Sequence, residues 1–492
     1  MSQLHFYTGF FPCLLGEILL LDLPYASRLK GDCFLTHCYR CYRRCLNLTP
    51  CRGCCQVGFC DEECALAAMQ PPVSSKNRCG LGYHLYECGG LPCFLLDNYA
   101  GWSKLASATG LADTSVGGAD MSHLAAACVA DTPPALLISA ICRAETHQAF
   151  AGSKVRTFPP SVFDPSDYLA ASWLVANSEH RSMSDLWQRT VAAVFLTYCL
   201  SVCGYPMDWT CENLFVAPSS SSRVELLSAS WIAALILYHL QAVPCNAHTY
   251  AETVLPRCQQ GVSLTASSVR PLASCLYPTL SLVNHSCDPN VLRVSTDSGR
   301  CLLLALRPLP AGTELLDCYS AHYALQERAE RQVDLLSQYF FACACVACAE
   351  DWPTAPVLMQ TPKSRISLHC PHCGGRLAAE TAGSTALTDG CSCGDAVNAR
   401  TRLKYATVVE DGLAARMKTI TQLFMSLPLE SIDSKLVASS VDWLKTVLGV
   451  DAEKGLSGFL WRPAPAWDLA QELFKLLIVI QTGNWCVEPA DN

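Results

Sequence analysis

Paired cysteines are the feature of this 492-residue sequence that most restricts its fold. Four short pairs succeed one another near the amino terminus: Cys38-x2-Cys41, Cys51-x2-Cys54, Cys60-x3-Cys64 and His84-x3-Cys88. A two-residue gap lets one tight turn direct both side chains at one ion, and a three-residue gap places both on one face of a helical turn. Seven thiolates and one imidazole are enough for two closed tetrahedral zinc sites. We therefore interpret these residues as zinc ligands rather than as unligated buried thiols.

Composition limits the class of protein further. The chain has 32 cysteines but is long enough to bury a core without disulfides, so a small disulfide scaffold is excluded. Only 16% of its residues are charged, which disfavours disorder. Its net charge is −8, and its only basic cluster is Arg40, Arg43 and Arg44. A DNA-binding zinc protein is therefore poorly supported, and we expect no specific nucleic-acid partner.

Three apolar stretches resemble targeting or membrane segments. The run at 10–15 has no basic residues before it, and Glu17 and Asp22 interrupt the apolar residues after it, which disfavours a secretory signal. Residues 190–207 and 226–244 are uncharged over about the length of a spanning helix, but both contain polar side chains. We interpret them as helices buried in a large domain. The expected protein is soluble, cytoplasmic and/or nuclear, with reduced thiols and no membrane partner.

Three further motifs carry the most specific signal. They are the segment Tyr277–Asn290, which contains Asn-His-Ser-Cys, the segment Ala311–Tyr319, and the cysteine-rich segment Tyr339–Cys348. In this order they resemble the core and post-SET segment of SET-domain proteins. The preceding cysteine pairs resemble a MYND zinc finger. Together the motifs resemble the SMYD family (SET and MYND domain proteins) over roughly residues 12–350, nearest the branch whose longer members carry N-terminal tetratricopeptide repeats.

This resemblance implies a protein-lysine N-methyltransferase that uses S-adenosylmethionine and acts on a histone or non-histone protein. By resemblance, Tyr319 is the catalytic residue, lining the lysine channel and the cofactor site, while Asn284, His285, Asn246 and Phe341 contact the cofactor. The chemistry suits these residue types because the sulfonium carries its own leaving group, so alignment of the displacement is the main requirement. An apolar channel also favours the neutral lysine amine that must attack.

The resemblance also implies how the ligands group. It implies two interleaved sites in the finger and a third that links the SET core to the post-SET segment: Cys38, Cys41, Cys60 and Cys64; Cys51, Cys54, His84 and Cys88; Cys287, Cys343, Cys345 and Cys348. If the third site holds zinc, loss of that zinc is expected to remove Phe341 from the pocket. MYND fingers generally bind protein partners, often proline-rich peptides. A fourth site of zinc-ribbon type is indicated by spacing alone, against unligated loop cysteines: Cys370, Cys373, Cys391 and Cys393.

The sequence departs from the family pattern in two places. Nineteen residues separate Cys64 from His84, about twice the usual number, and the usual tryptophan before the histidine is missing. The segment Thr8–Glu17 lacks the G-x-G turn that normally wraps the cofactor. Either the chain is an amino-truncated isoform or gene model, or its cofactor pocket is incomplete. The alternative function is therefore a catalytically weak or inactive scaffold that binds partners through the finger and the C-terminal helices.

The predicted fold is α+β, with a β-rich SET core split by the zinc finger and a helical insert. A strand is expected at Ile18–Leu21, and a helix face at Leu413, Met417, Ile420 and Phe424. The chain is expected to divide into these segments: 1–36, N-terminal SET part; 37–93, MYND finger; 94–270, helical insert and linker; 271–325, SET core; 326–350, post-SET zinc segment; 351–398, zinc ribbon; 399–492, helical, tetratricopeptide-like domain.

Overall fold

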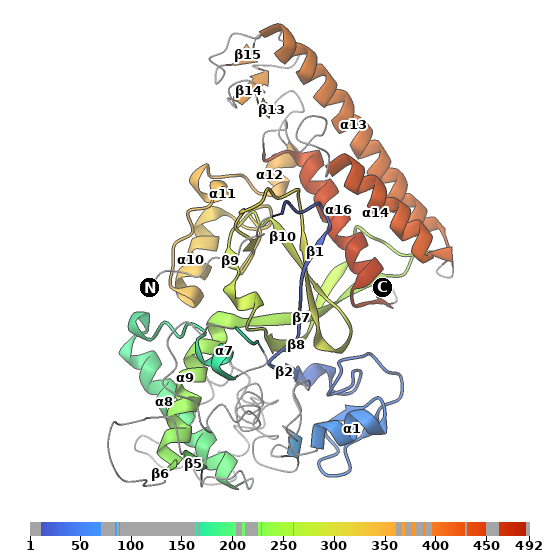
Figure 1. The fold of residues 1–492 in the computed structure, drawn as a ribbon. Helices are drawn as coiled ribbons and strands as arrows, with labels where there is room; N and C mark the ends of the chain where they lie inside the picture. Colours follow the sequence, from blue (N-terminus) through green and yellow to red (C-terminus); the bar gives the residue numbers. More distant parts are fainter. Residues whose placement is uncertain are drawn as a thin grey trace, which may run out of the picture.

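The structure of the protein is a computed structural model. It describes residues 11–69, 84–85, 88, 163–165, 168–202, 209–211, 225–227, 229–258, 260–360, 367–369, 376–379, 387–388, 396–428, 431–448 and 462–488. Strands occupy the middle of the molecule (Figure 1). Below the strands in that view lie α8 (Met183–Val202), α9 (Ala229–Asn246) and α1 (Glu62–Met69). Above and beside the strands lie α13 (Ala396–Ser426), α14 (Ser434–Leu448) and α16 (Pro465–Thr482). The fold is mixed helix and strand, as predicted.

A four-stranded sheet has the order β16-β7-β8-β2. Its strands are Ala26–Leu29 (β2), Ala247–Pro256 (β7), Ser268–Leu276 (β8) and Trp485–Glu488 (β16). β7 and β8 pair antiparallel, with an irregularity between Tyr250 and Ala251, and β16 pairs parallel to β7. The boundary predicted at 271 falls inside β8, and β7 lies in the segment expected to be a helical insert and linker. The β-branched and aromatic residues of β7 carried the missed signal.

A second sheet has the order β1-β11-β10, with strands Ile18–Asp22 (β1), Val291–Ser295 (β10) and Cys301–Ala305 (β11). The predicted strand at Ile18–Leu21 is confirmed by β1. Beside this sheet lies a short parallel pair, Asn284–His285 (β9) and Leu316–Asp317 (β12). Parallel pairing of segments about 30 residues apart brings the Asn-His-Ser-Cys motif next to the segment that leads to Tyr319.

Two apolar helices, Met183–Val202 (α8) and Ala229–Asn246 (α9), pack on each other. Leu196, Leu200, Ile236 and Leu240 are buried between them, which confirms the interpretation of the two uncharged stretches as buried helices. Among the helices that the structure describes, none is both long and apolar enough to span a membrane. Tyr168–Ser172 (α7) precedes this pair.

The C-terminal region is helical, with Ala396–Ser426 (α13), Ser434–Leu448 (α14) and Pro465–Thr482 (α16). The predicted face of α13 is confirmed, since Leu413, Met417, Ile420 and Phe424 are all buried. These side chains share one core with residues of β7, β10 and β11, so the helices pack directly on the strands. The short strand β16, which sequence patterns did not reveal, returns the chain to the first sheet.

The remaining elements are short. They are β3 (Thr49–Pro50), β4 (Gly58–Phe59), α1 (Glu62–Met69), β5 (Trp209–Cys211), β6 (Glu225–Leu227), α10 (Arg328–Tyr339), α11 (Val346–Ala349), α12 (Ala355–Gln360), β13 (Ser367–His369), β14 (Arg376–Ala379) and β15 (Leu387–Thr388). The predicted ribbon segment thus contains a three-stranded antiparallel sheet, β13-β14-β15. Its four cysteines, Cys370, Cys373, Cys391 and Cys393, lie outside the described residues.

Candidate active site and metal centres

Tyr319 lies two residues after β12, directly beside the Asn284–His285 strand. Its main-chain N–H donates to Nδ1 of His285 at 2.9 Å, and its hydroxyl donates to the carbonyl oxygen of Val283 at 2.5 Å. The tyrosine is therefore held at both its main chain and its side chain by the strand that carries the Asn-His motif. The structure brings three of the predicted site residues, Asn284, His285 and Tyr319, into one place.

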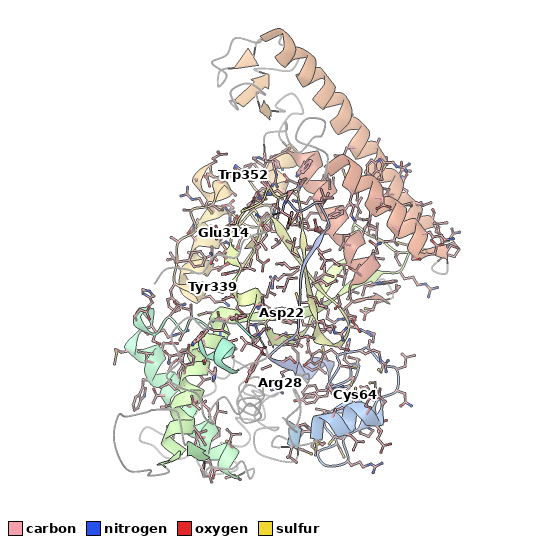
Figure 2. All side chains as sticks on the ribbon, in the orientation of Figure 1. Asp22, Arg28, Cys64, Glu314, Tyr339 and Trp352 are labelled. Carbon is pink, nitrogen blue, oxygen red and sulfur yellow. The ribbon has the colours of Figure 1, made fainter. Side chains whose placement is uncertain are left out.

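An aromatic cluster surrounds Tyr319. Its ring centroid lies 5.2 Å from that of His285, 5.0 Å from that of Tyr339 and 6.4 Å from that of Phe341. The hydroxyl of Tyr339 also donates to the carbonyl oxygen of Tyr319 at 3.2 Å. Tyr339 was not predicted as a site residue, although it opens the cysteine-rich motif. Figure 2 shows Tyr339 and Glu314 on the side of the molecule formed by α10 and α11.

The main chain between Tyr339 and Phe341 adopts an unusual conformation that separates the two neighbouring phenylalanines. Phe340 has φ of +61°, a left-handed conformation that is costly for a bulky side chain. Its ring packs against His180 and beneath the Arg181 guanidinium, while Phe341 enters the aromatic cluster. The strained residue thus ends α10 and connects the cluster to the segment before α8.

Burial sets the protonation of the cluster. Burial lowers the pKa of His285 to about 4, so the imidazole is neutral at physiological pH and its Nδ1 accepts the Tyr319 N–H. Burial also raises the pKa of Tyr319, and it raises that of Tyr339 to about 12. Both phenols therefore stay protonated, and Tyr319 can orient a bound group by hydrogen bonding but cannot serve as a phenolate base.

Two residues missed by the sequence interpretation support Asn284. The Asn284 amide donates to Oε1 of Glu314 at 2.8 Å. Asn290 donates to the Glu314 carbonyl oxygen at 2.8 Å and accepts from the Leu316 N–H at 2.8 Å. Both Glu314 and Asn290 lie inside the recognised motifs, but only the parallel strands show that they link the two motifs.

Asn246 occupies the last position of α9. It is 9% exposed, and its amide donates to the carbonyl oxygens of Val175 at 2.9 Å and Ala242 at 2.6 Å. Its own carbonyl accepts the Ser281 hydroxyl at 3.1 Å, in the 3-10 turn that precedes Asn284. The contacts of Asn246 thus tie α9 to the Asn-His strand.

The first predicted zinc group is assembled. All four ligand atoms of Cys38, Cys41, Cys60 and Cys64 lie within 4.8 Å of one another. The Sγ atoms of Cys41 and Cys60 are 3.6 Å apart, and those of Cys60 and Cys64 are 3.5 Å apart. A regular tetrahedron with Zn–S bonds of ~2.3 Å has an edge of about 3.8 Å, so the sulfur spacing fits zinc and is far too long for a disulfide.

The second group is also assembled, despite the long segment before His84. The Sγ atoms of Cys51 and Cys88 are 3.5 Å apart, and Nε2 of His84 lies 3.4 Å from Cys51 Sγ and 3.6 Å from Cys54 Sγ. A Cβ atom on Gly53 would lie 2.4 Å from the Cys88 sulfur, so only glycine fits this turn. Nitrogen–sulfur spacings of about 3.6 Å suit tetrahedral zinc with these ligands.

The third group joins Cys287 of the Asn-His-Ser-Cys motif to Cys343, Cys345 and Cys348. Cys287 Sγ lies 3.9 Å from Cys343 Sγ and 3.5 Å from Cys348 Sγ. Arg331, which has no exposed surface, directs a guanidinium nitrogen at Cys348 Sγ at 3.6 Å. A zinc ion with four thiolates carries a net charge of −2, so this buried arginine offsets part of it. Cys287 and Cys343 stand two residues beyond His285 and Phe341.

A buried ion-pair network fixes the other side of the motif loop. Asp288 accepts two hydrogen bonds from Arg462 at 2.8 Å and one from Arg307 at 3.0 Å. Arg462 also pairs with Asp468 of α16 at 2.9 Å and lies 5.5 Å from the centroid of the Trp352 ring. The loop after Asn284 and His285 is therefore attached to the C-terminal helices.

Comparison with known proteins agrees with this geometry. A family model described as SET domain matches residues 166–320. The chain is 24% identical over 427 residues to protein-lysine N-methyltransferase SMYD4 of Danio rerio, covering 76% of this chain and 52% of that protein. It is 26% identical to human SMYD4, covering 67% and 40%, and 44% identical over 73 residues to mouse histone-lysine N-methyltransferase SMYD3, covering 15% and 16%.

The parallel strands, the Asn-His motif and the matched family model define a protein with a SET domain. The described residues also hold three groups of four side chains that suit a metal ion, two of cysteines only and one of three cysteines and His84. The relatives are named as SMYD proteins. In these features the chain is similar to the SMYD proteins. It spans about half the length of the SMYD4 proteins that it matches.

Proposed function

We propose that this protein is a protein-lysine N-methyltransferase that transfers a methyl group from S-adenosylmethionine to a lysine of a protein substrate. The observation that carries the proposal is the fixation of Tyr319 by Val283 and His285, beside Asn284. The relatives SMYD4 and SMYD3 are named as lysine methyltransferases, which supports it. The proposed substrate is a histone or a non-histone protein.

The residues present suit S-adenosylmethionine. Asn284 offers an amide, His285 a neutral imidazole, and Phe341 an aromatic ring. The cofactor, when bound, supplies a methyl group on a sulfonium that is its own leaving group. The protonated Tyr319 hydroxyl would orient the lysine amine, and the surrounding rings exclude water and so favour the neutral amine. The protein then contributes mainly alignment rather than proton transfer by Tyr319.

We also propose structural zinc at all three assembled groups, and a fourth zinc at the ribbon cysteines. Support comes from sulfur spacings that fit tetrahedral zinc and from Gly53, whose turn admits no Cβ. The third zinc would hold His285 and Phe341 through their neighbours Cys287 and Cys343. A chelator that removes this zinc and leaves cofactor affinity unchanged would contradict the link.

The finer domain arrangement is part of the proposal. We assign residues 37–93 to a MYND finger that binds protein partners such as proline-rich peptides, and 326–350 to a post-SET segment. Given strands β7 and β8, the SET core resumes near residue 247 rather than at 271. A reducing cytoplasmic or nuclear environment suits the proposed thiolate sites.

Two measurements test the proposal. Calorimetric titration with S-adenosylmethionine is expected to show one site in the wild type and a loss of affinity in Asn284→Ala, which removes the amide. Labelled methyl transfer to a histone and lysate panel is then expected to fall at least about tenfold in Tyr319→Phe and to persist in the control Tyr198→Phe, whose side chain is 63% exposed on α8. Absence of cofactor binding by the wild type would favour the non-catalytic scaffold.

A further inference from the structure

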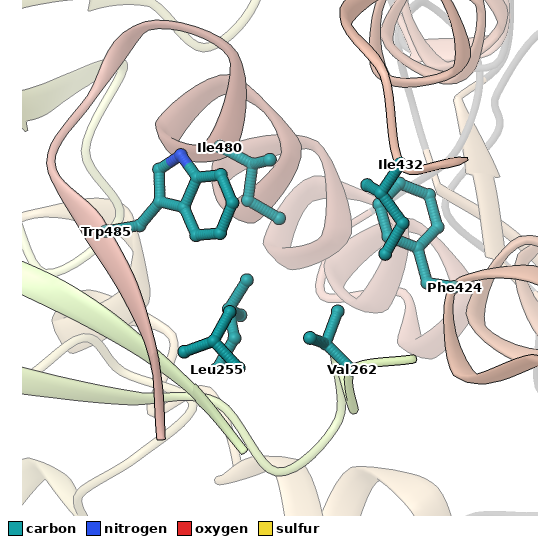
Figure 3. Close-up of a pocket in the computed structure, with 7 residues that line it drawn as sticks. Leu255, Val262, Phe424, Ile432, Ile480 and Trp485 are labelled. Atoms are coloured by element: carbon teal, nitrogen blue, oxygen red, sulfur yellow. The ribbon is translucent and has the colours of Figure 1, made fainter. Parts of the chain in front are cut away.

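An apolar cavity lies between the four-stranded sheet and the C-terminal helices (Figure 3). Its volume is about 220 Å³. Its walls come from β7, the loop after β7, α13, α16, β16 and the segment before α14: Leu255, Val262, Phe424, Ile432, Ile480, Trp485 and Val487. None of the lining residues belongs to the motifs that define the proposed methyl-transfer site, and nothing in that function requires the cavity.

Main-chain hydrogen bonds fix the positions of the walls relative to one another. The Gly261 N–H donates to the Met425 carbonyl at 3.1 Å, and the Val262 N–H donates to the Phe424 carbonyl at 3.0 Å. A Cβ atom on Gly261 would lie 2.0 Å from the Phe424 carbonyl oxygen. Only glycine therefore allows the main chain of the loop to pack this closely on the end of α13. On the other side, Leu255 pairs with Val487 in the β7–β16 ladder. The main chain on both sides of the cavity is therefore fixed by hydrogen bonds.

The chemistry of the walls determines what can occupy this space. All seven lining side chains are apolar apart from the indole N–H of Trp485, so a water molecule would find few of the two to four polar partners that it needs. Empty space of this size would forfeit dispersion contacts on every wall. Apolar cavities of only ~150 Å³ stay dry and bind benzene. The volume and the lining therefore suit one small apolar molecule.

Trp485 is the most exposed of the lining residues and provides an aromatic wall. Its side chain is 38% exposed, whereas Leu255, Val262 and Phe424 are almost completely buried. In Figure 3 its ring lies at one side of the cavity, facing the aliphatic side chains. We propose that this cavity is a binding site for a small uncharged ligand, an aromatic ring or a short branched hydrocarbon group with no hydrogen-bonding function at its buried end.

The test uses the full chain and toluene as the probe, with phenol as a ring of similar size that carries a hydroxyl. Toluene is expected to raise the melting temperature of the wild type by at least about 2 °C at saturation, and phenol by clearly less. Val262→Phe and Ile480→Phe, which fill the cavity, are expected to abolish the toluene shift. The matched control Val333→Phe, at a 64% exposed position on α10, is expected to keep it.

A second measurement locates the ligand without relying on variants that must fold. Crystals soaked in bromobenzene are expected to show anomalous bromine signal between Leu255 and Trp485. The proposal is overturned if toluene leaves the wild-type melting temperature unchanged, if folded Val262→Phe and Ile480→Phe respond as the wild type does, or if bromine is found only elsewhere. Because the readouts are stability and position, they are independent of methyl transfer.

Discussion

Replacing Glu252 by glutamine should destabilise the protein more than the same replacement at an exposed glutamate. Glu252 lies on β7 with 1% of its side chain exposed, and its Oε1 is 3.2 Å from Arg44, 2.9 Å from Arg270 and 3.4 Å from Nε2 of His37. Arg44 and Arg270 also pair with Glu488 of β16. Glu252 and its two arginines therefore link the segment that contains Arg44 to three strands of the four-stranded sheet, β7, β8 and β16.

The size of the effect can be worked from the pKa of Glu252. Burial by itself would raise this pKa, but the nearby His37 imidazole, the hydrogen bond from Arg44 and the positive charge of Arg44 lower it from an ordinary 4.5 to about 2. That difference corresponds to about 3 kcal/mol of stabilisation, at ~1.4 kcal/mol per pH unit. Because the folded pKa is depressed, the contribution is complete above pH 4.5 and is lost as the pH falls towards 2.

Urea unfolding in zinc-containing buffer, followed by tryptophan fluorescence, measures the loss. Glu252→Gln is expected to lower the free energy of unfolding by about 2–3 kcal/mol at pH 7.5, since glutamine keeps some hydrogen bonds but no charge. Glu472→Gln is the control, because Glu472 is 60% exposed in its pair with Lys475 and should contribute less than about 1 kcal/mol. The gap between wild type and Glu252→Gln should stay constant from pH 8 to 5.5. A Glu252→Gln protein as stable as the control, or a gap that closes above pH 6, would refute the reasoning.

Two further substitutions test the metal sites and the motif loop. Gly53→Ala places a Cβ atom 2.4 Å from the Cys88 sulfur. In a chelator competition it should lower the affinity of the second site for zinc roughly 10–100-fold. The control Gly412→Ala, which has open space around it on α13, should leave zinc binding unchanged. Equal zinc retention in both variants would contradict a ligand role for Cys88. Arg462→Leu leaves Asp288, which is 8% exposed, with one ion-pair partner fewer. It should lower the free energy of unfolding by roughly 3 kcal/mol and therefore lower the melting temperature. An unchanged melting temperature would mean that the ion-pair network does not hold the loop.

Much of the candidate site could be predicted because its signals are local. The spacing of Cys51 and Cys54 encodes a turn that directs both sulfurs at one point, and the Asn-His-Ser-Cys run encodes a strand and the loop after it. Tyr339 and Glu314 could not be assigned in this way. Their roles depend on β9 pairing with β12 and on the left-handed turn at Phe340, and no single segment specifies either arrangement.

The strand β7 was not predicted for a related reason. β7 continues directly from a long apolar helix without a glycine or a loop between them, since Asn246 ends α9 and Ala247 begins the strand. Local patterns mark a change of element by turn residues, but here Pro244 and Asn246 belong to the last turn of α9 and not to a separate loop. The pairing of β7 with β8 and β16 decides that these residues are a strand.

The sequence by itself predicted the kinds of metal ligand and the buried helix faces, because both depend on spacings of a few residues. Its motifs also resemble those of a known family. Tertiary structure alone decided which distant groups meet. It brought Cys287 to three cysteines more than 50 residues away, a grouping that the family resemblance implies but no spacing encodes. It also placed Glu252 beside Arg44 and Arg270 and left a cavity between sheet and helices that no sequence pattern predicts. The physical reason is that short spacings act through fixed turn geometry, whereas these encounters depend on the packing of the whole core.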